Sequence, residues 1–180
     1  MTSVQTPPAF ELPAALLSQG YRLRPETEAD IPFLMQLYAS TRERELEPLS
    51  WTIEQKQAFL ASQFQAQRHH YRTNIPDCAF EVLELNGTPV GRLYLEARQA
   101  RLHIVDIALM PERRGQGLGS AILRALHAAA SARGRGLGIF VEKFNPALRL
   151  YRRLGFAEVA DREVYLEMEW SPDAAQRRAS

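Results

Sequence analysis

A glycine-rich turn near the middle of the chain has the composition of an anion-binding loop. The segment RRGQGLGS contains two arginines followed by three glycines at alternate positions: Arg113, Arg114, Gly115, Gly117 and Gly119. Glycine has no Cβ atom, so an anion can approach the backbone closely and accept hydrogen bonds from outward-pointing N–H groups. A helix that begins at this turn would add the partial positive charge of its N-terminus. The segment therefore predicts a loop that binds phosphate.

Two common nucleotide-binding patterns do not fit this loop. A Walker-type loop needs a lysine directly after its glycines, and none stands there. The dinucleotide pattern GxGxxG needs glycine at its sixth position, which is Ser120 when counted from Gly115 and Ile122 when counted from Gly117. We therefore expect phosphate in another kind of ligand, and a binder of nucleotide phosphates stays as an alternative.

The elements on the two sides of the loop are a strand and a helix. The preceding run HIVDIALM, residues 103–110, is mostly apolar and ends before Pro111, as expected for a buried strand. Behind the loop, apolar residues recur at helical spacing from Gly117 to Arg133. A strand, a glycine-rich turn and a helix in this order place an anion at the helix N-terminus.

The first half of the chain predicts one strand followed by two helices. The strand begins at Tyr21, and Thr27 offers an N-cap for the first helix. Thr52 and Gln55 have the spacing of a capping box at the start of the second helix. That helix is expected to end before Pro76.

The second half predicts a hairpin, more strands and two further helices. Asn86-Gly87 is a strong signal for a hairpin turn. The last helix is expected to have Asn145 as its cap, Pro146 as its first residue and Gly155 at its end. The resulting order, β-α-α-β-β-β-α-β-α-β-β, predicts an α/β fold in which helices cover both faces of a mixed sheet.

Length and composition restrict the classes of protein. The chain has 180 residues, enough for one domain with a core, and a net charge of +1, so neither nucleic acid nor a membrane is an expected partner. Cys78 is the only cysteine, which excludes an internal disulfide and fits the cytoplasm. The N-terminus has neither the pattern of a signal peptide nor that of a membrane span. We expect a lead-in over residues 1–20, the domain over 21–170 and a tail over 171–180.

Two motifs together resemble the GCN5-related N-acetyltransferase (GNAT) superfamily. The first is R-x-x-G-x-G at Arg114, Gly117 and Gly119, which resembles that family's loop for the pyrophosphate of acetyl-CoA. The second, N-x5-Y-x3-G-F, is formed by four residues further along the chain: Asn145, Tyr151, Gly155 and Phe156. The resemblance implies the acyl-CoA N-acyltransferase fold, with a central, mostly antiparallel sheet of about seven strands. It also implies direct transfer of acetyl from acetyl-CoA to a primary amine of a small molecule or peptide.

The resemblance further implies which residues bind acetyl-CoA. The backbone of Ile107, Ala108 and Leu109 would bond to the pantetheine arm. The pyrophosphate would lie on the whole turn: Arg113, Arg114, Gly115, Gln116, Gly117, Leu118, Gly119 and Ser120. Asn145 would contact the cofactor or serve only as a helix cap. Tyr151 would protonate the leaving thiolate, although a buried aromatic on its helix would have the same spacing.

His103 and Asp106 are rival candidates for the general base. Relatives place a histidine or a glutamate at the position of His103, and an ordinary imidazole has a pKa near 6.5. Asp106 interrupts an apolar strand, so its carboxylate must be paired or have a raised pKa. It is therefore either a base or an anchor that pairs with Arg92, Arg101 or a loop N–H, and the anchor is favoured.

Several alternatives stay open for the chemistry. Strand alternation puts His103 and Asp106 on opposite faces unless a β-bulge intervenes. Glu142 and Glu96 are weaker candidates for the base, and water could carry the proton without any side chain. The acceptor is expected over the first two helices and the last hairpin. A CoA-binding sensor without turnover is the alternative function. No metal is expected, and a homodimer is compatible with the related folds.

Overall fold

The computed structural model describes residues 10–172, in which seven strands form one sheet and five α-helices flank it. The strands are β1 (Tyr21–Pro25), β2 (Cys78–Leu85), β3 (Thr88–Ala97), β4 (Arg101–Leu109), β5 (Gly136–Glu142), β6 (Ala157–Arg162) and β7 (Tyr165–Trp170). The helices are α1 (Ala14–Ser18), α2 (Ile31–Leu46), α3 (Ile53–Asn74), α4 (Leu118–Ser131) and α5 (Leu148–Arg153). Residues 1–9 of the expected lead-in and 173–180 of the expected tail lie outside the described residues.

Local signals in the sequence account for the beginnings of several elements. The N–H of Gln55 donates to the Thr52 hydroxyl at 3.2 Å, and the Gln55 side chain accepts from the Thr52 N–H at 2.9 Å, so the capping box that starts α3 is present. Asn86 and Gly87 have φ of 51° and 80°, the left-handed conformation that a tight hairpin turn between β2 and β3 requires.

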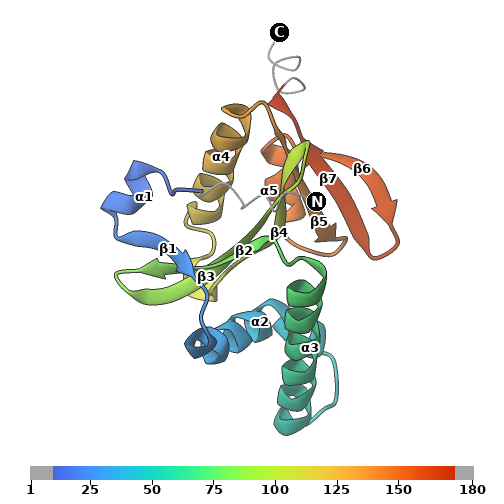
Figure 1. Cartoon of the computed structure of the whole chain (residues 1–180). Coiled ribbons are helices and arrows are strands. Elements are labelled where there is room, and N and C mark those ends of the chain that lie inside the picture. Colours follow the sequence, from blue (N-terminus) through green and yellow to red (C-terminus); the bar gives the residue numbers. More distant parts are fainter. Residues whose placement is uncertain (1–9, 173–180) are drawn as a thin grey trace.

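Helices cover both faces of the sheet (Figure 1), as the sequence predicts. The larger core lies between the sheet and α1, α4 and α5, and it includes Leu16 of α1. A smaller core joins α2 and α3 to the other face through Leu34, Tyr38, Phe64 and Val82. The strand order is β1-β2-β3-β4-β5-β7-β6, and every neighbouring pair is antiparallel except β4 and β5.

A β-bulge in β4 changes which residues share a face. Tyr94 pairs with Asp106 and the next residue of β3 pairs with Ile104, so Val105 is an extra residue in β4. Simple alternation across the strand is therefore wrong here. His103 and Asp106 both lie on the side of α2 and α3, whereas Ile104 belongs to the larger core on the opposite side.

The last helix begins later than the sequence predicts. Helix α5 starts at Leu148, because Asn145 through Ala147 form a turn rather than a first helical turn. Asn145 still satisfies a backbone donor, since its side chain accepts from the Ala147 N–H at 2.9 Å. The helix ends at Arg153, and Gly155 follows its C-cap with φ of 88°, as expected for a glycine that terminates a helix.

Candidate functional site

The two central parallel strands pair over only part of their length. The β4–β5 pairing runs from Arg101–Gly136 to Ile104–Ile139 and then stops. Beyond it, residues 105–109 of β4 pair only with β3, and residues 140–142 of β5 pair only with β7. We call these two facing, unpaired edges the fork. Backbone N–H and C=O groups on an unpaired edge can bond to an extended ligand as a further strand would.

The fork opens toward the glycine-rich turn. Ile107, Ala108 and Leu109 are half-buried residues at the end of its β4 edge, as expected for a strand that offers backbone groups to a ligand. The turn then leads into α4, whose N-cap is Gly117. The strand, turn and helix expected from the sequence are thus present in that order.

The backbone of the turn is accessible to a ligand. Gly115 and Gly117 have φ of 72° and 85°, a region that favours glycine, and a Cβ atom on either would meet no atom within 4 Å. The N–H groups of Gly115, Gln116 and Gly117 donate to no backbone carbonyl in the described part of the chain. The first N–H groups of α4 lack helical partners by geometry. This set of free donors fits an anion at the helix N-terminus.

The remaining members of the turn differ in burial and bonding. Leu118 is buried, whereas Gly119 and Ser120 are half-buried in the first turn of α4. The Gln116 side chain donates to the carbonyl of Glu112 at 2.6 Å, so it closes the turn from inside. The side chain of Gln116 is therefore occupied, while its backbone N–H stays free.

The two arginines of the turn also differ. Arg113 has a buried Nε with no hydrogen-bond partner among the described residues, which fits a donor that awaits an anion. The Arg114 side chain, in contrast, already makes hydrogen bonds within the protein. Its Nε donates to the Leu109 carbonyl at 2.8 Å, and its Nη2 donates to the Ser40 hydroxyl of α2 at 2.8 Å. Burial lowers the pKa of Arg114, which nevertheless stays a cation at neutral pH.

Tyr151 lies where α5 packs on the sheet. Its side chain is buried, its ring contacts Phe156 edge to face with a centroid distance of 5.6 Å, and its hydroxyl makes no hydrogen bond within the described residues. Burial, and then the field of Asp106, raise the pKa of Tyr151. The group is therefore a neutral phenol that can donate a proton. Both sequence interpretations, a buried aromatic and an acid, are compatible with this position.

Asp106 is held by one of the partners that the sequence analysis considered. Its Oδ2 accepts from Arg92 Nη2 at 2.7 Å and from the Tyr71 hydroxyl at 3.2 Å. Oδ1 has no hydrogen-bond partner in the described chain. Arg92 is 4% exposed, so Asp106 neutralises a buried charge. One oxygen thus anchors the strand, while the other is free on the face that carries α2 and α3.

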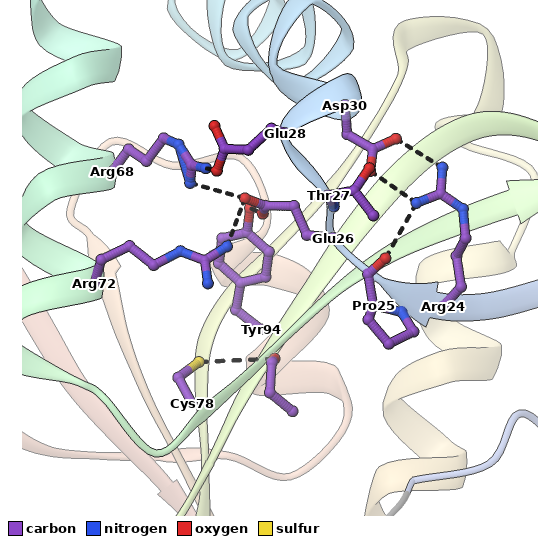
Figure 2. Close-up of polar contacts among 11 residues, drawn as sticks. Arg24, Pro25, Glu26, Thr27, Glu28, Asp30, Arg68, Arg72, Cys78 and Tyr94 are labelled. Atoms are coloured by element: carbon purple, nitrogen blue, oxygen red, sulfur yellow. Dashed lines mark hydrogen bonds and ion pairs between the residues drawn. The ribbon is translucent and has the colours of Figure 1, made fainter.

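The position of Tyr71 depends on a buried ionic cluster beneath α3. Figure 2 shows Glu26 between Arg68 and Arg72, with the Tyr94 hydroxyl bonded to the same carboxylate. The arginine contacts are 2.9 and 2.7 Å, and the Glu26 side chain is 1% exposed. These bonds fix α3 to β3 on either side of Tyr71. Burial, and then the field of Asp106, raise the pKa of Tyr71, which therefore stays a hydrogen-bond donor.

His103 has the wrong environment for a base that works near neutral pH. It is 5% exposed and packs against Phe140 with a ring distance of 5.2 Å. Burial, together with Arg98 and Arg101, lowers the pKa of His103 to about 3. The buried ring also leaves no open approach for an acceptor amine. The environment of His103 therefore favours a packing role.

Sequence reasoning missed two groups near the fork. Tyr71 and Gln67 of α3 contact the Asp106–Arg92 pair, and Arg42 of α2 pairs with Glu142 at the end of β5. No local pattern marks these residues, because each contact joins positions at least 25 residues apart. The one available signal is Arg92 itself, a charge within an apolar strand, which the sequence already offers as a partner for Asp106.

Residues 10–172 lack two features that mark other classes of protein. No three histidine, cysteine, aspartate or glutamate side chains gather there as a metal ion would require. None of the helices in the same range has the length and apolar character needed to cross a bilayer.

Known proteins resemble this chain in part of its sequence and in its fold. Residues 76–158 match the family model described as the acetyltransferase (GNAT) domain. Streptothricin acetyltransferase of Streptomyces lavendulae is 48% identical over 61 residues, which are 32% of this chain and 31% of that protein. Mycothiol acetyltransferase of Thermobispora bispora is 29% identical over 187 residues, which are 97% of this chain and 56% of that protein. The chain thus spans about a third and about half of the lengths of these two relatives.

A solved structure supports the same fold. The PaiA N-acetyltransferase of Thermoplasma acidophilum, in complex with coenzyme A, aligns with a TM-score of 0.62 over 84% of this chain and 98% of that chain. The sequence identity is 14%, so the comparison bears on the fold alone. It agrees with the mixed, mostly antiparallel sheet that the two motifs predict.

Proposed function

We propose that this chain, which matches the GNAT acetyltransferase family model over residues 76–158, is an N-acetyltransferase that moves acetyl directly from acetyl-CoA to a primary amine of a small molecule or peptide. The observation that carries the proposal is the fork between β4 and β5, which ends at a turn of unpaired N–H groups. An extended thioester arm that ends in a pyrophosphate matches this combination of a strand edge and an anion loop.

The proposed cofactor contacts follow the chain. The backbone at residues 107–109 bonds to the pantetheine arm, and residues 113–120 hold the pyrophosphate through N–H groups and Arg113. Asn145 lies at the turn before α5, where its side chain is already bonded to the Ala147 N–H, so we assign it to that turn. When bound, acetyl-CoA supplies an activated carbonyl and a thiolate leaving group.

The proposed chemistry uses two groups of the chain. Asp106 accepts the proton of the acceptor ammonium on Oδ1, because its other oxygen is already bonded to Arg92 and Tyr71. The neutral amine then forms the C–N bond while the C–S bond breaks. Tyr151, a neutral phenol with a free hydroxyl, donates its proton to the departing sulfur, and the second proton that the nitrogen loses as the amide forms restores the phenol. The one proton left over, on Asp106, is released to water. The two roles suit a carboxylate and a phenol that are close enough to interact electrostatically.

The acceptor is proposed to approach over α2, α3 and the β6–β7 hairpin. Asp106 faces the α2 and α3 side, and the aromatic side chains of Phe140 and Tyr165 are 41% and 43% exposed on β5 and β7. The cytoplasm is the proposed location, since the one cysteine, Cys78, is a free thiol.

A screen of amines tests this function. The purified chain is incubated with acetyl-CoA and a panel of amines, peptide N-termini and lysine peptides, and CoA release is followed with a thiol reagent. We expect release that depends on the acceptor, with an acetylated product detectable by mass spectrometry. If acetyl-CoA binds but no amine in the panel is acetylated, the sensor alternative replaces the enzyme.

A further inference from the structure

Helix α2 contacts the ends of both strands that form the fork. On the β4 side, Arg114 joins the Leu109 carbonyl to Ser40 of α2. On the β5 side, Arg42 of α2 pairs with Glu142, the last residue of that strand. Residues two apart on a helix point in nearly opposite directions, so Ser40 and Arg42 leave α2 on opposite sides. Helix α2, on one face of the sheet, is therefore linked to the β4 end through Arg114 and to the β5 end directly.

The Arg42 contact has the geometry of a specific pair. Its Nη1 and Nη2 donate to the two oxygens of Glu142 at 2.9 and 2.7 Å, a bidentate arrangement. The side chains are 24% and 26% exposed, so water screens the pair only in part. Arg42 is also fixed by Glu45 at 2.9 Å and by the Tyr38 ring, whose centroid is 5.6 Å from its guanidinium carbon.

The end of β5 has few other constraints toward β4. Beyond Ile139 it pairs only with β7, and the β4 edge opposite it pairs only with β3. The backbone hydrogen bonds of the sheet therefore do not fix the distance between the two edges of the fork. The side-chain hydrogen bonds through Ser40 and Arg42 link these edges through helix α2.

We propose that Ser40 and Arg42 of α2, with Arg114 and Glu142, form a brace that sets the width of the fork for the thioester arm of acetyl-CoA. This inference rests on the proposed function. Arg42 and Glu142 are then positioning residues: they do not touch the reacting atoms, but they hold the β5 edge at the spacing at which acetyl-CoA binds. Glu142, a weaker candidate for the base in the sequence analysis, is bonded to Arg42 and acts through it.

Charge exchange across the pair tests the brace. Arg42→Gln and Glu142→Gln each remove one partner, and the exchange Arg42→Glu with Glu142→Arg restores a pair of opposite polarity. Since Glu45 would repel a carboxylate at position 42, the exchange is made together with Glu45→Gln, and Glu45→Gln alone is its reference. Glu158→Gln, which removes the exposed pair with Arg152, is the matched control. Acetyl-CoA affinity is measured by calorimetry well below each melting temperature.

The expected results are specific to positioning. Each single Gln variant should bind acetyl-CoA about 10-fold more weakly than the original chain. The charge-exchange variant should bind acetyl-CoA with an affinity within about 3-fold of that of Glu45→Gln. Glu158→Gln should have the affinity of the original chain. Unchanged affinity in both single variants would overturn the brace, as would affinity that falls without recovery in the exchange. A loss of kcat confined to Glu142→Gln, with normal acetyl-CoA affinity, would show instead that Glu142 is the base. If the original chain binds no acetyl-CoA, the proposed function fails, which is a separate result.

Discussion

Asp106 and Arg92 form an ion pair in which a single carboxylate oxygen, Oδ2, accepts from the guanidinium at 2.7 Å. The same oxygen accepts from Tyr71, and Oδ1 has no partner in the described part of the chain. One side chain thus satisfies a buried cation and still presents an acceptor atom on the α3 side of the sheet. The anchor and the base, which the sequence sets against each other, can be two oxygens of one carboxylate.

The two roles of Asp106 can be separated by mutation. Asp106→Asn leaves the charge of Arg92 buried without a counter-ion, so the free energy of unfolding should fall by about 3 kcal/mol. The double variant Arg92→Met with Asp106→Leu removes both charges and should recover stability to within about 1 kcal/mol of the original. Urea denaturation measures both values.

Activity of the double variant then decides between the roles. We expect kcat/KM to stay about 100-fold below that of the original chain, because no carboxylate accepts the proton. A double variant that is stable and fully active would leave Asp106 with the anchor role alone.

Tyr151→Phe should separate proton donation from packing. The ring and its contact with Phe156 are kept, so the melting temperature should be unchanged. The leaving thiolate would lack a proton donor, and kcat should fall about 100-fold while acetyl-CoA affinity is retained. Steady-state kinetics and calorimetry measure the two effects. An unchanged kcat would mean that the phenol serves only the core.

Gly117→Ala tests the anion loop, with Gly134→Ala as a control. Both glycines have positive φ, 85° and 61°, and a Cβ atom on either would meet nothing within 4 Å. Each substitution should therefore cost a similar amount of stability, about 1 kcal/mol, from backbone strain alone. Only Gly117 lies at the proposed pyrophosphate site, so only that variant should bind acetyl-CoA about 10-fold more weakly. Equal acetyl-CoA affinities in the two variants would contradict a pyrophosphate site at this loop.

Buried histidines should make stability depend on pH. Burial lowers the pKa of His103 to about 3 and that of His127 to about 4, below the value near 6.5 of an unfolded chain. The unfolded state therefore binds more protons between these values, so stability is full above about pH 6.5 and is lost as the pH falls. His103→Gln should reduce the slope of unfolding free energy between about pH 6 and 5 by roughly 1 kcal/mol per pH unit.

The activity profile gives a second test of His103. If His103 were the base with an ordinary pKa, kcat/KM would have an acidic limb near pH 6.5 that disappears in His103→Gln. We expect no limb that depends on this residue. Its appearance would restore His103 as the base.

Local signals in the sequence were sufficient for most elements of the fold. The Thr52–Gln55 capping box, the Asn86-Gly87 turn and the glycine at 155 each act through neighbouring residues, so the elements they delimit lie where they were predicted. The predicted start of α5 was wrong because the Asn145 side chain closes a turn on the Ala147 N–H, and the helix begins only after it, at Leu148.

The parts of the site that depend on distant contacts could not be predicted in this way. The bulge at Val105 follows from the register between β3 and β4. Because of this bulge, the β4 residues before it lie on the opposite face from the one that simple alternation predicts. The Arg42–Glu142 pair joins residues 100 positions apart. The loop at 113–120 could be identified, since its composition and its neighbours in the chain carry the signal.

The most direct test of the central claim is the change in stability that acetyl-CoA causes in the original chain. A ligand that binds the native state with a Kd about 100-fold below its concentration adds about 2.7 kcal/mol to the free energy of unfolding. At about 1 mM acetyl-CoA we therefore expect the melting temperature to rise by roughly 5–10 °C. ATP and NAD at the same concentration should have much smaller effects. No shift with acetyl-CoA, or a larger shift with ATP or NAD, would contradict the account.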